Sequence, residues 1–339
     1  MKALVLAPMT AEHLSRLKEL MQVTYESWAD TRELADPQEL ARRIKTEGFS
    51  VLVVEADFLP EELFQQAGDL RLVAVCRNSL SHIDLAAATG HGVAVVHTPG
   101  RNIQAVAELT IGMMLTLARS IIALDTCVKE GRWQMPVEPY IQAHLQAGEL
   151  AGKTLGILGL GNIGRKVAQL ACAFEMRVLA YDPYVESSTR EASAQKSPNV
   201  TLCPTVAELA RIADYVSLHV PDVPGTKDLL SRSVLAEIKP GCRIINTSSY
   251  DAVDQAALVE CLKSGRVAGA AFDVFPTHPL PPNSPLLGFD NVVLTPHIGG
   301  ATRETVARHS DMIVQDIERS VQRRKPERLA NPEVWGQFD

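Results

Sequence analysis

The chain has 339 residues, of which 46% are hydrophobic, 22% charged and only 5% aromatic, and its formal net charge is −7. This length predicts two globular domains, and the charged and hydrophobic contents exclude a disordered chain. The acidic balance argues against a nucleic-acid partner or an anionic membrane surface. The scarcity of aromatic residues favours α/β layers with aliphatic cores.

The sequence indicates neither a membrane span nor a disulfide framework. Its longest uncharged runs, Leu85–Gly100 and Val274–Phe289, fall short of the roughly 18 apolar residues of a transmembrane helix. The cysteines form no C-x-x-C pair, so we expect no zinc site and no disulfides. Reduced, buried thiols in a cytoplasmic protein without a bound metal are the simplest interpretation.

The N-terminal part alternates between short apolar runs and helical patterns, as expected of βα units around a parallel sheet. Strands are predicted at Ala3–Leu6, Val51–Val54, Leu72–Val75 and Val93–Val95. A helix is predicted to begin at Asp36-Pro37, because Asp is a favoured N-cap and Pro suits the first helical position.

A long helix is predicted over Asn102–Leu124, with Asn102 as its cap. Its apolar residues surround the helix axis rather than forming one stripe. A helix that is apolar all round is buried on both sides, so this one is expected to lie between domains or in a dimer interface.

A second series of strands and helices begins at Thr154. Its six predicted strands are Thr154–Leu158, Arg177–Ala180, Tyr215–Leu218, Arg243–Asn246, Val267–Ala271 and Val292–Leu294. Such a series predicts one complete doubly wound dinucleotide-binding domain over residues 103–300. A further helix, from Thr302 to about Gln322, then has to return to the N-terminal part. We therefore expect a smaller, discontinuous α/β domain formed by residues 1–102 plus 301–339.

A glycine motif opens the second series. Gly159-Leu160-Gly161-Asn162-Ile163-Gly164 has the pattern G-x-G-x-x-G, follows a predicted strand and begins a predicted helix. In this context the first glycine permits a tight turn, the second lets the backbone approach a pyrophosphate, and the third allows close helix–strand packing. Asp182, at the end of the next strand, would bind the ribose hydroxyls and repel a 2′-phosphate. The pattern predicts NAD rather than NADP.

With these motifs the sequence resembles the D-isomer-specific 2-hydroxyacid dehydrogenases. The matching segments are Val93–Glu108, the glycine motif, Leu218-His219-Val220-Pro221, Ile245-Asn246-Thr247-Ser248, Gly269–Phe275 and Leu294–Gly300. The resemblance implies a Rossmann-type NAD-binding domain inserted into a smaller flavodoxin-like substrate domain. It also implies an NAD-dependent oxidoreductase and, with the apolar helix, a homodimer.

The resemblance implies catalytic residues that are only partly present. His297 matches the family's general acid/base, which exchanges a proton with the substrate oxygen. The family's arginine, which holds the substrate's carboxylate and carbonyl, is replaced by Ser249. The glutamate that normally pairs with the catalytic histidine is replaced by His278. Ser and His supply neither the guanidinium fork nor the negative charge.

Other residues are candidates for binding the substrate. Arg77, Asn78 and Ser79 lie in the loop after a predicted strand that approaches substrate in the family. Arg101 is next to the predicted domain boundary, and either arginine could replace the missing cation. Tyr250 and His278 could offer hydrogen bonds to a different substrate.

The remaining cofactor contacts are also implied by the resemblance. His219, Val220 and Pro221, with Thr226 nearby, match the lining of the adenine pocket. Thr247 and Ser248 are expected at the edge of the nicotinamide. Asp273 is expected to contact the nicotinamide carboxamide, with a loop carboxylate satisfied by its own neighbours as the alternative.

Three functions remain open on the sequence. The preferred one is a dehydrogenase of small, anionic 2-hydroxy or 2-oxo acids, whose substrate is held by other cations. The second is a non-standard reaction that uses bound NAD on the same fold. The third is a catalytically weak NAD-binding protein with a sensing or interaction role. The intact glycine motif favours the first two.

Overall fold

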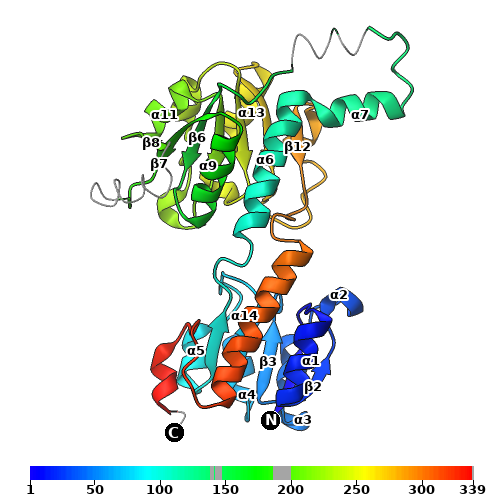
Figure 1. Ribbon diagram of the computed structural model, residues 1–339, viewed down its shortest axis with the longest axis vertical. Helices are drawn as coiled ribbons and strands as arrows, with labels where there is room; N and C mark the ends of the chain where they lie inside the picture. The colour runs from blue at the N-terminus through cyan, green and yellow to red at the C-terminus, as the bar shows by residue number, and fades with distance from the viewer. Residues whose placement is uncertain (138–140, 142–146, 186–199, 338–339) are drawn as a thin grey trace. The chain divides into compact units, whose positions relative to one another are not determined.

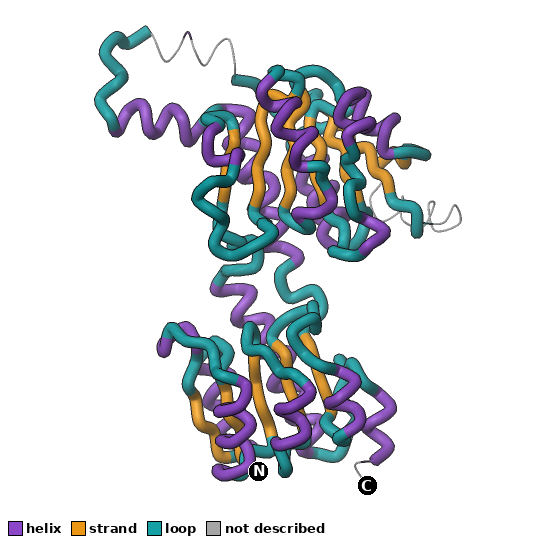
Figure 2. Tube along the Cα trace, turned by 180° about the vertical axis from the view of Figure 1, so that it is seen from behind, coloured by secondary structure: helices purple, strands orange, loops and turns teal. Residues whose placement is uncertain are grey.

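The computed structural model describes residues 1–137, 141, 147–185 and 200–337. The chain divides into two compact units (Figure 1). Unit 1 comprises Met1–Arg101 and Ala301–Asp339, and unit 2 comprises Asn102–Gly300. In each unit, helices flank a sheet of parallel strands (Figure 2), which confirms the α/β fold.

Unit 1 is built on a five-stranded parallel sheet in the order β2-β1-β3-β4-β5, a flavodoxin-like order. The strands are β1 (Lys2–Val5), β2 (Gln22–Tyr25), β3 (Val51–Val54), β4 (Leu72–Val75) and β5 (Ala94–His97). β3 and β4 coincide with two predicted strands. The sequence prediction omits β2, an edge strand of exposed and half-buried residues without the apolar run that marks a buried strand.

Alternate residues of the unit 1 strands enter two cores, one on each face of the sheet. The helices are α1 (Ala11–Leu20), α2 (Trp28–Thr31), α3 (Pro37–Glu47), α4 (Glu61–Gln66), α5 (Leu85–Gly90) and α14 (Arg303–Val321), with the 3₁₀ turn η4 (Pro332–Gln337). Asp36 caps α3 by accepting hydrogen bonds from two backbone N–H groups. The C-terminal α14 packs beside α1 (Figure 1) through Ile313, Val314 and Ile317, so the last helix does return to the N-terminal part.

Unit 2 is built on a seven-stranded parallel sheet in the order β12-β11-β10-β9-β6-β7-β8. The strands are β6 (Thr154–Leu158), β7 (Arg177–Tyr181), β8 (Val200–Leu202), β9 (Tyr215–Leu218), β10 (Cys242–Asn246), β11 (Val267–Phe272) and β12 (Val292–Leu294). The sequence predicts all of these except the short, half-buried β8. The strand order reverses between β6 and β9, where doubly wound sheets bind their ligands outside the carboxyl ends of the strands.

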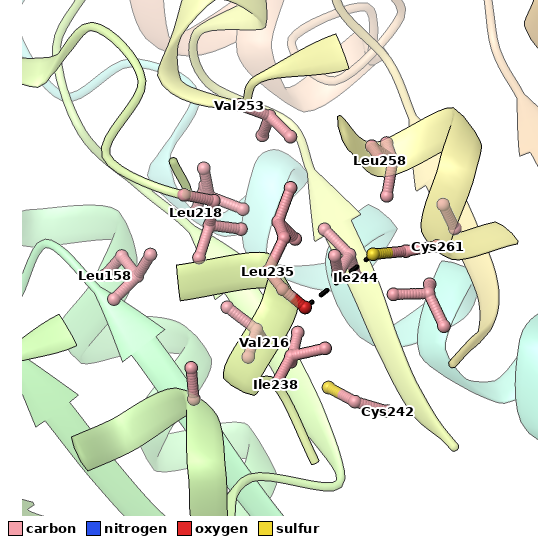
Figure 3. Packing of buried hydrophobic residues seen from close by; sticks show 14 of the residues in the cluster. Leu158, Val216, Leu218, Leu235, Ile238, Cys242, Ile244, Val253, Leu258 and Cys261 are labelled. Carbon is pink, nitrogen blue, oxygen red and sulfur yellow. Dashed lines mark hydrogen bonds between the residues drawn. The ribbon is translucent and has the colours of Figure 1, made fainter. Parts of the chain in front are cut away.

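Helices cover the unit 2 sheet. They are α6 (Ile103–Arg119), α7 (Ile121–Lys129), α9 (Asn162–Ala173), α11 (Val206–Ile212), α12 (Arg232–Glu237) and α13 (Gln255–Lys263), with the 3₁₀ turns η1 (Pro224–Thr226), η2 (Tyr250–Ala252) and η3 (Pro285–Gly288). Figure 3 shows one core, where Val216 and Ile244 of the sheet meet Leu235 of α12 and Cys261 of α13.

The predicted helix over Asn102–Leu124 is wrong in its second part. α6 ends at Arg119, Ser120 adopts a left-handed conformation with φ of 51°, and α7 begins at Ile121. Most apolar residues of α6 are buried against unit 2, whereas Ile121 and Ile122 are about half exposed, at 49% and 52%. In the described part of the chain no single helix is long and apolar enough to cross a membrane; α6 and α7 qualify only together, across a 63° bend.

Candidate functional site

The glycine loop between β6 and α9 is shaped by close backbone contacts. Gly159 has φ of 92°, and a Cβ added there would lie 2.5 Å from the carbonyl oxygen of His219. A Cβ on Gly164 would collide with the carbonyl oxygen of Gly159. Gly161, in contrast, faces open space, with nothing within 4 Å of an added Cβ. The loop therefore presents bare backbone, and the N-terminal N–H groups of Asn162 and Ile163 follow it, as a bound pyrophosphate requires.

Asp182 lies directly after β7 and is hydrogen-bonded to the glycine loop. Its Oδ2 accepts a hydrogen bond of 2.8 Å from the backbone N–H of Leu160, and its Oδ1 accepts one of 2.9 Å from that of Tyr184. The carboxylate is thus fixed at the edge of the loop where the ribose of a dinucleotide is expected. Contact between Asp182 and a ribose stays a prediction.

The segment after β9 packs against the same loop. Val220 lies beside Gly159, with its Cγ1 3.0 Å from an added Cβ. His219 is half-buried, its Nε2 lies 2.8 Å from the hydroxyl of Ser217, and its enclosed Nδ1 has no partner among the described residues. Burial lowers the pKa of His219 to about 3, which keeps the ring neutral. The Thr226 hydroxyl donates to the carbonyl of Pro221 at 2.7 Å, so this turn holds itself together.

Two imidazoles meet at the carboxyl ends of β11 and β12. The Nδ1 of His297 lies 3.0 Å from the Nε2 of His278, and the two ring centroids are 5.0 Å apart. Both residues are exposed. His297 has φ of 56°, a left-handed conformation that is uncommon outside glycine and that clusters at functional sites.

Asp273 holds the loop that carries His297. It lies after β11, is 1% exposed and accepts three hydrogen bonds from this loop. Its Oδ1 accepts from the Thr295 hydroxyl at 2.6 Å and from the N–H of Ile298 at 2.8 Å, and its Oδ2 accepts from the N–H of Gly299 at 2.7 Å. This geometry supports the alternative of a loop carboxylate satisfied by its neighbours. Its contact with a nicotinamide carboxamide stays a prediction.

The turn after β10 is organised by Asn246, whose role the sequence analysis missed. Its amide nitrogen donates to the carbonyl of Ser249 at 2.7 Å, and its amide oxygen accepts from the N–H of Ser248 at 3.1 Å. Ser249 is 3% exposed, and its hydroxyl donates to Oδ1 of Asp222 at 3.1 Å. Asp222 was also missed, because its proximity to Ser249 depends on the pairing of β9 with β10.

Two neighbours of Ser249 point in different directions. The hydroxyl of Thr247 lies 3.2 Å from that of Thr110 on α6, which ties the turn to that helix. The ring of Tyr250 packs against Phe272, with centroids 6.3 Å apart. Burial, and secondarily the charge of Asp251, raise the pKa of Tyr250. Tyr250 therefore contributes to the core of unit 2, and its predicted contact with substrate has no direct support from this packing.

Three of the predicted substrate residues lie in unit 1, after β4. Arg77 forms no ion pair with any residue that the structure describes, and Asn78 and Ser79 are exposed. The Ser79 hydroxyl donates to that of Ser81 at 3.1 Å. Arg77 thus keeps a guanidinium that can meet an anion.

Arg101 is not free in the same way. It is 8% exposed, its Nη2 lies 2.7 Å from Oε1 of Glu55, and its Nη1 donates to Nδ1 of His309 at 2.7 Å. The charge of Arg101 is thus already paired inside unit 1, and its contact with a substrate anion stays a prediction. Burial lowers the pKa of His309, and Nε2 of that ring bonds the carbonyl of Pro8 at 2.7 Å.

The parallel sheet, the glycine loop and the carboxylate after β7 together define a dinucleotide-binding enzyme fold of the Rossmann type. Residues 111–299 match the family model of the D-isomer specific 2-hydroxyacid dehydrogenase NAD-binding domain. The chain belongs to the D-isomer specific 2-hydroxyacid dehydrogenases. It is an enzyme, and NAD is its cofactor.

Relatives agree with this family over nearly the whole chain. A glyoxylate reductase from Thermofilum pendens is 37% identical over 95% of this chain and 91% of its own length. A D-3-phosphoglycerate dehydrogenase from Methanocaldococcus jannaschii is 33% identical over 97% of this chain, which spans 59% of that longer protein. A crystal structure of a protein from Thermus thermophilus is 33% identical, covers 97% of this chain and 100% of its own, and has a TM-score of 0.82.

Proposed function

We propose that the enzyme interconverts a small 2-hydroxy acid and its 2-oxo acid, with His297 as the general acid and base. NAD supplies the chemistry of hydride acceptance or donation. The observation that carries the proposal is the loop geometry around His297, whose ring is presented by a loop anchored on buried Asp273. His297 would protonate the carbonyl oxygen during reduction and take the proton back during oxidation.

His278 takes over the role of orienting His297. In a hydrogen bond between two imidazoles one ring must donate and the other accept. At 3.0 Å between Nδ1 of His297 and Nε2 of His278, this hydrogen bond fixes the orientation of the His297 ring. Because His278 is exposed, its other ring nitrogen can exchange a proton with water. A glutamate would instead favour a protonated His297.

The substrate carboxylate needs a cation other than the arginine that Ser249 replaces. A preorganised donor at the reacting group is worth about 10²–10³ in rate, so its loss is not neutral. Arg77 is the predicted cation that stays unpaired in the described chain, and its role as the carboxylate-binding residue remains part of this proposal.

The same two replacements favour a second candidate function. Without the arginine and the glutamate, NAD could serve a non-standard reaction or a sensing role. The glycine loop and Asp182 would serve these functions equally well, so cofactor binding does not discriminate among them. Turnover of 2-oxo acids distinguishes the dehydrogenase from these other functions.

The deciding experiment measures NADH oxidation with glyoxylate, hydroxypyruvate, pyruvate and phosphohydroxypyruvate. We expect at least one of them to be reduced, and His297→Ala to lower kcat by about 10²–10⁴ with unchanged NADH binding. His91→Ala, at an exposed residue of unit 1, is the matched control and should keep full activity. Tight NADH binding without turnover of any acid would favour the second candidate instead.

We also propose a cytoplasmic homodimer. Support for the dimer comes from α7, whose Ile121, Ile122 and Val128 are each about half exposed in one chain, at 49%, 52% and 54%. Adjacent exposed apolar side chains of this size favour burial against a partner. Six free cysteines suit a reducing compartment.

A further inference from the structure

The residue that replaces the family's arginine is held by a carboxylate. Ser249 is buried, and its hydroxyl donates to Oδ1 of Asp222 at 3.1 Å. Ser249 follows β10 and Asp222 follows β9, and these strands are neighbours in the sheet. Both residues therefore lie at the carboxyl edge of the sheet, the edge to which His297 also belongs. A carboxylate therefore lies beside the position at which the family pattern has an arginine.

Asp222 has unused capacity to bind a ligand. It is exposed, and within the described chain its Oδ2 accepts no hydrogen bond and neither oxygen takes part in an ion pair. An ionised carboxylate only accepts hydrogen bonds, so this solvent-exposed oxygen can accept one from a donor group of a ligand. The bond from Ser249 fixes the orientation of the carboxylate and leaves that oxygen available.

We propose that Asp222, oriented by Ser249, binds a positively charged group on the substrate. The inference rests on the proposed function and names its substrate class: a 2-hydroxy or 2-oxo acid whose side chain ends in an ammonium or guanidinium group. A cationic donor forms a charge-assisted hydrogen bond with the free oxygen. A second carboxylate on the substrate is repelled, because no arginine at position 249 compensates Asp222.

The same contact explains why position 249 is small. An arginine there would form an ion pair with Asp222 and occupy the carboxylate that the substrate needs. Serine donates one hydrogen bond and leaves the negative charge uncompensated. Ser249 is thus a positioning residue, and Asp222 determines specificity.

The first test compares three 2-oxo acids of similar length, whose side chains end in a guanidinium, a methyl or a carboxylate group. We expect kcat/KM to fall in that order, by about tenfold at each step, as the loss of one charge-assisted bond predicts. Asp222→Asn should reduce the preference for the guanidinium acid over the carboxylate acid at least tenfold. Ser249→Ala should reduce this preference by a smaller factor. Ser249→Thr, which keeps the hydroxyl, should have the same preference as the wild type.

The second test does not depend on turnover. Calorimetry on the NAD-saturated protein measures the binding of the three corresponding 2-hydroxy acids. We expect the guanidinium acid to bind most tightly, and Asp222→Asn to weaken it about tenfold while strengthening the carboxylate acid. Asp228→Asn, which removes an exposed charge from the same loop, should change neither value.

The outcomes separate the two proposals. Absence of turnover together with Asp222-dependent binding of the guanidinium acid would reject the proposed reaction and retain the cation site. Turnover of the carboxylate acid as well as or better than the guanidinium acid, or a preference untouched by Asp222→Asn, would overturn the cation site alone. Equal binding of all three acids would overturn it as well.

Discussion

Asp273 and His219 are polar side chains at the carboxyl ends of unit 2 strands. Asp273 is buried and His219 is half-buried with an enclosed ring nitrogen, and the two differ in how many hydrogen bonds compensate them. Asp273 accepts hydrogen bonds from three donors of one loop, and these bonds offset the cost of burying it. His219 has one hydrogen bond and one unpartnered ring nitrogen. A buried imidazole without a counter-ion remains neutral, so its protonation opposes folding.

This difference predicts acid sensitivity. The pKa of His219 is lowered to about 3 by burial, against about 6.5 when unfolded. The unfolded state therefore binds more protons below pH 6.5, and the stabilisation present above that pH is lost as the pH falls toward 3. Between pH 7 and pH 5 the free energy of unfolding should drop by about 2 kcal/mol through this residue.

Urea unfolding at the two pH values measures this effect. His219→Asn should show a drop smaller by about 2 kcal/mol than the wild-type protein, and His91→Asn, at an exposed position, should behave like the wild type. An identical drop in wild type and His219→Asn would show that His219 is not protonated on unfolding. His82, whose pKa burial lowers to about 4, adds to the drop in all three proteins.

The residue scale is also where sequence reasoning succeeded least. The sequence predicts Ser249 and His278 as departures from a motif, and the resemblance implies that His278 lies beside His297, but nothing in the sequence indicates that Asp222 is the partner of Ser249. Asp222 is separated from Ser249 by 27 residues, and His278 from His297 by 19. Only the pairing of parallel strands brings such residues together, and no local pattern encodes it.

At the scale of elements, two glycines of the turn between β6 and α9 are required for different reasons. Gly164 is required by packing, because an added Cβ would collide with the carbonyl of Gly159. Gly161 is not, because an added Cβ there meets nothing within 4 Å. Its bare backbone instead allows a close approach by the cofactor.

Replacing each of these glycines by alanine should therefore change a different property, stability for Gly164 and NADH binding for Gly161. Gly164→Ala should lower the free energy of unfolding by about 1–3 kcal/mol through overpacking. Gly161→Ala should leave stability within about 0.5 kcal/mol and weaken NADH binding roughly tenfold or more, by blocking the pyrophosphate. Thermal melts and NADH fluorescence titration check both, each variant serving as the other's control. Normal NADH affinity in Gly161→Ala would contradict the pyrophosphate position.

At the scale of the whole molecule, the chain leaves unit 1 to form unit 2 and then returns to unit 1. Unit 1 is completed only when α14 packs its Ile313, Val314 and Ile317 onto the N-terminal sheet. Unit 2 leaves α7 outside its core, with exposed Ile121 and Ile122. The break at Ser120 separates α6, which has many buried residues, from α7, which has none.

The proposed homodimer follows from α7. Sedimentation equilibrium should show a dimer for the wild-type chain, and Ile122→Glu should weaken association by about tenfold or more, since a charge would replace a buried anchor. Ile212→Glu alters an apolar residue on α11 that is similarly exposed, at 43%, and should leave the dimer intact. A wild-type monomer at all concentrations would reject the proposal, and equal effects of both variants would exclude α7 as the interface.

The sequence alone predicted the glycine loop, the family and every strand of the two sheets except β2 and β8. These features arise from residues close together in the chain: apolar runs, glycines at fixed spacing and short motifs. Only the tertiary structure decided that Arg101 is paired with Glu55, that Asp273 is occupied by its own loop and that Ser249 meets Asp222. The reason is that strand order and helix packing set which distant side chains meet, and charges are compensated by whatever neighbour that packing supplies.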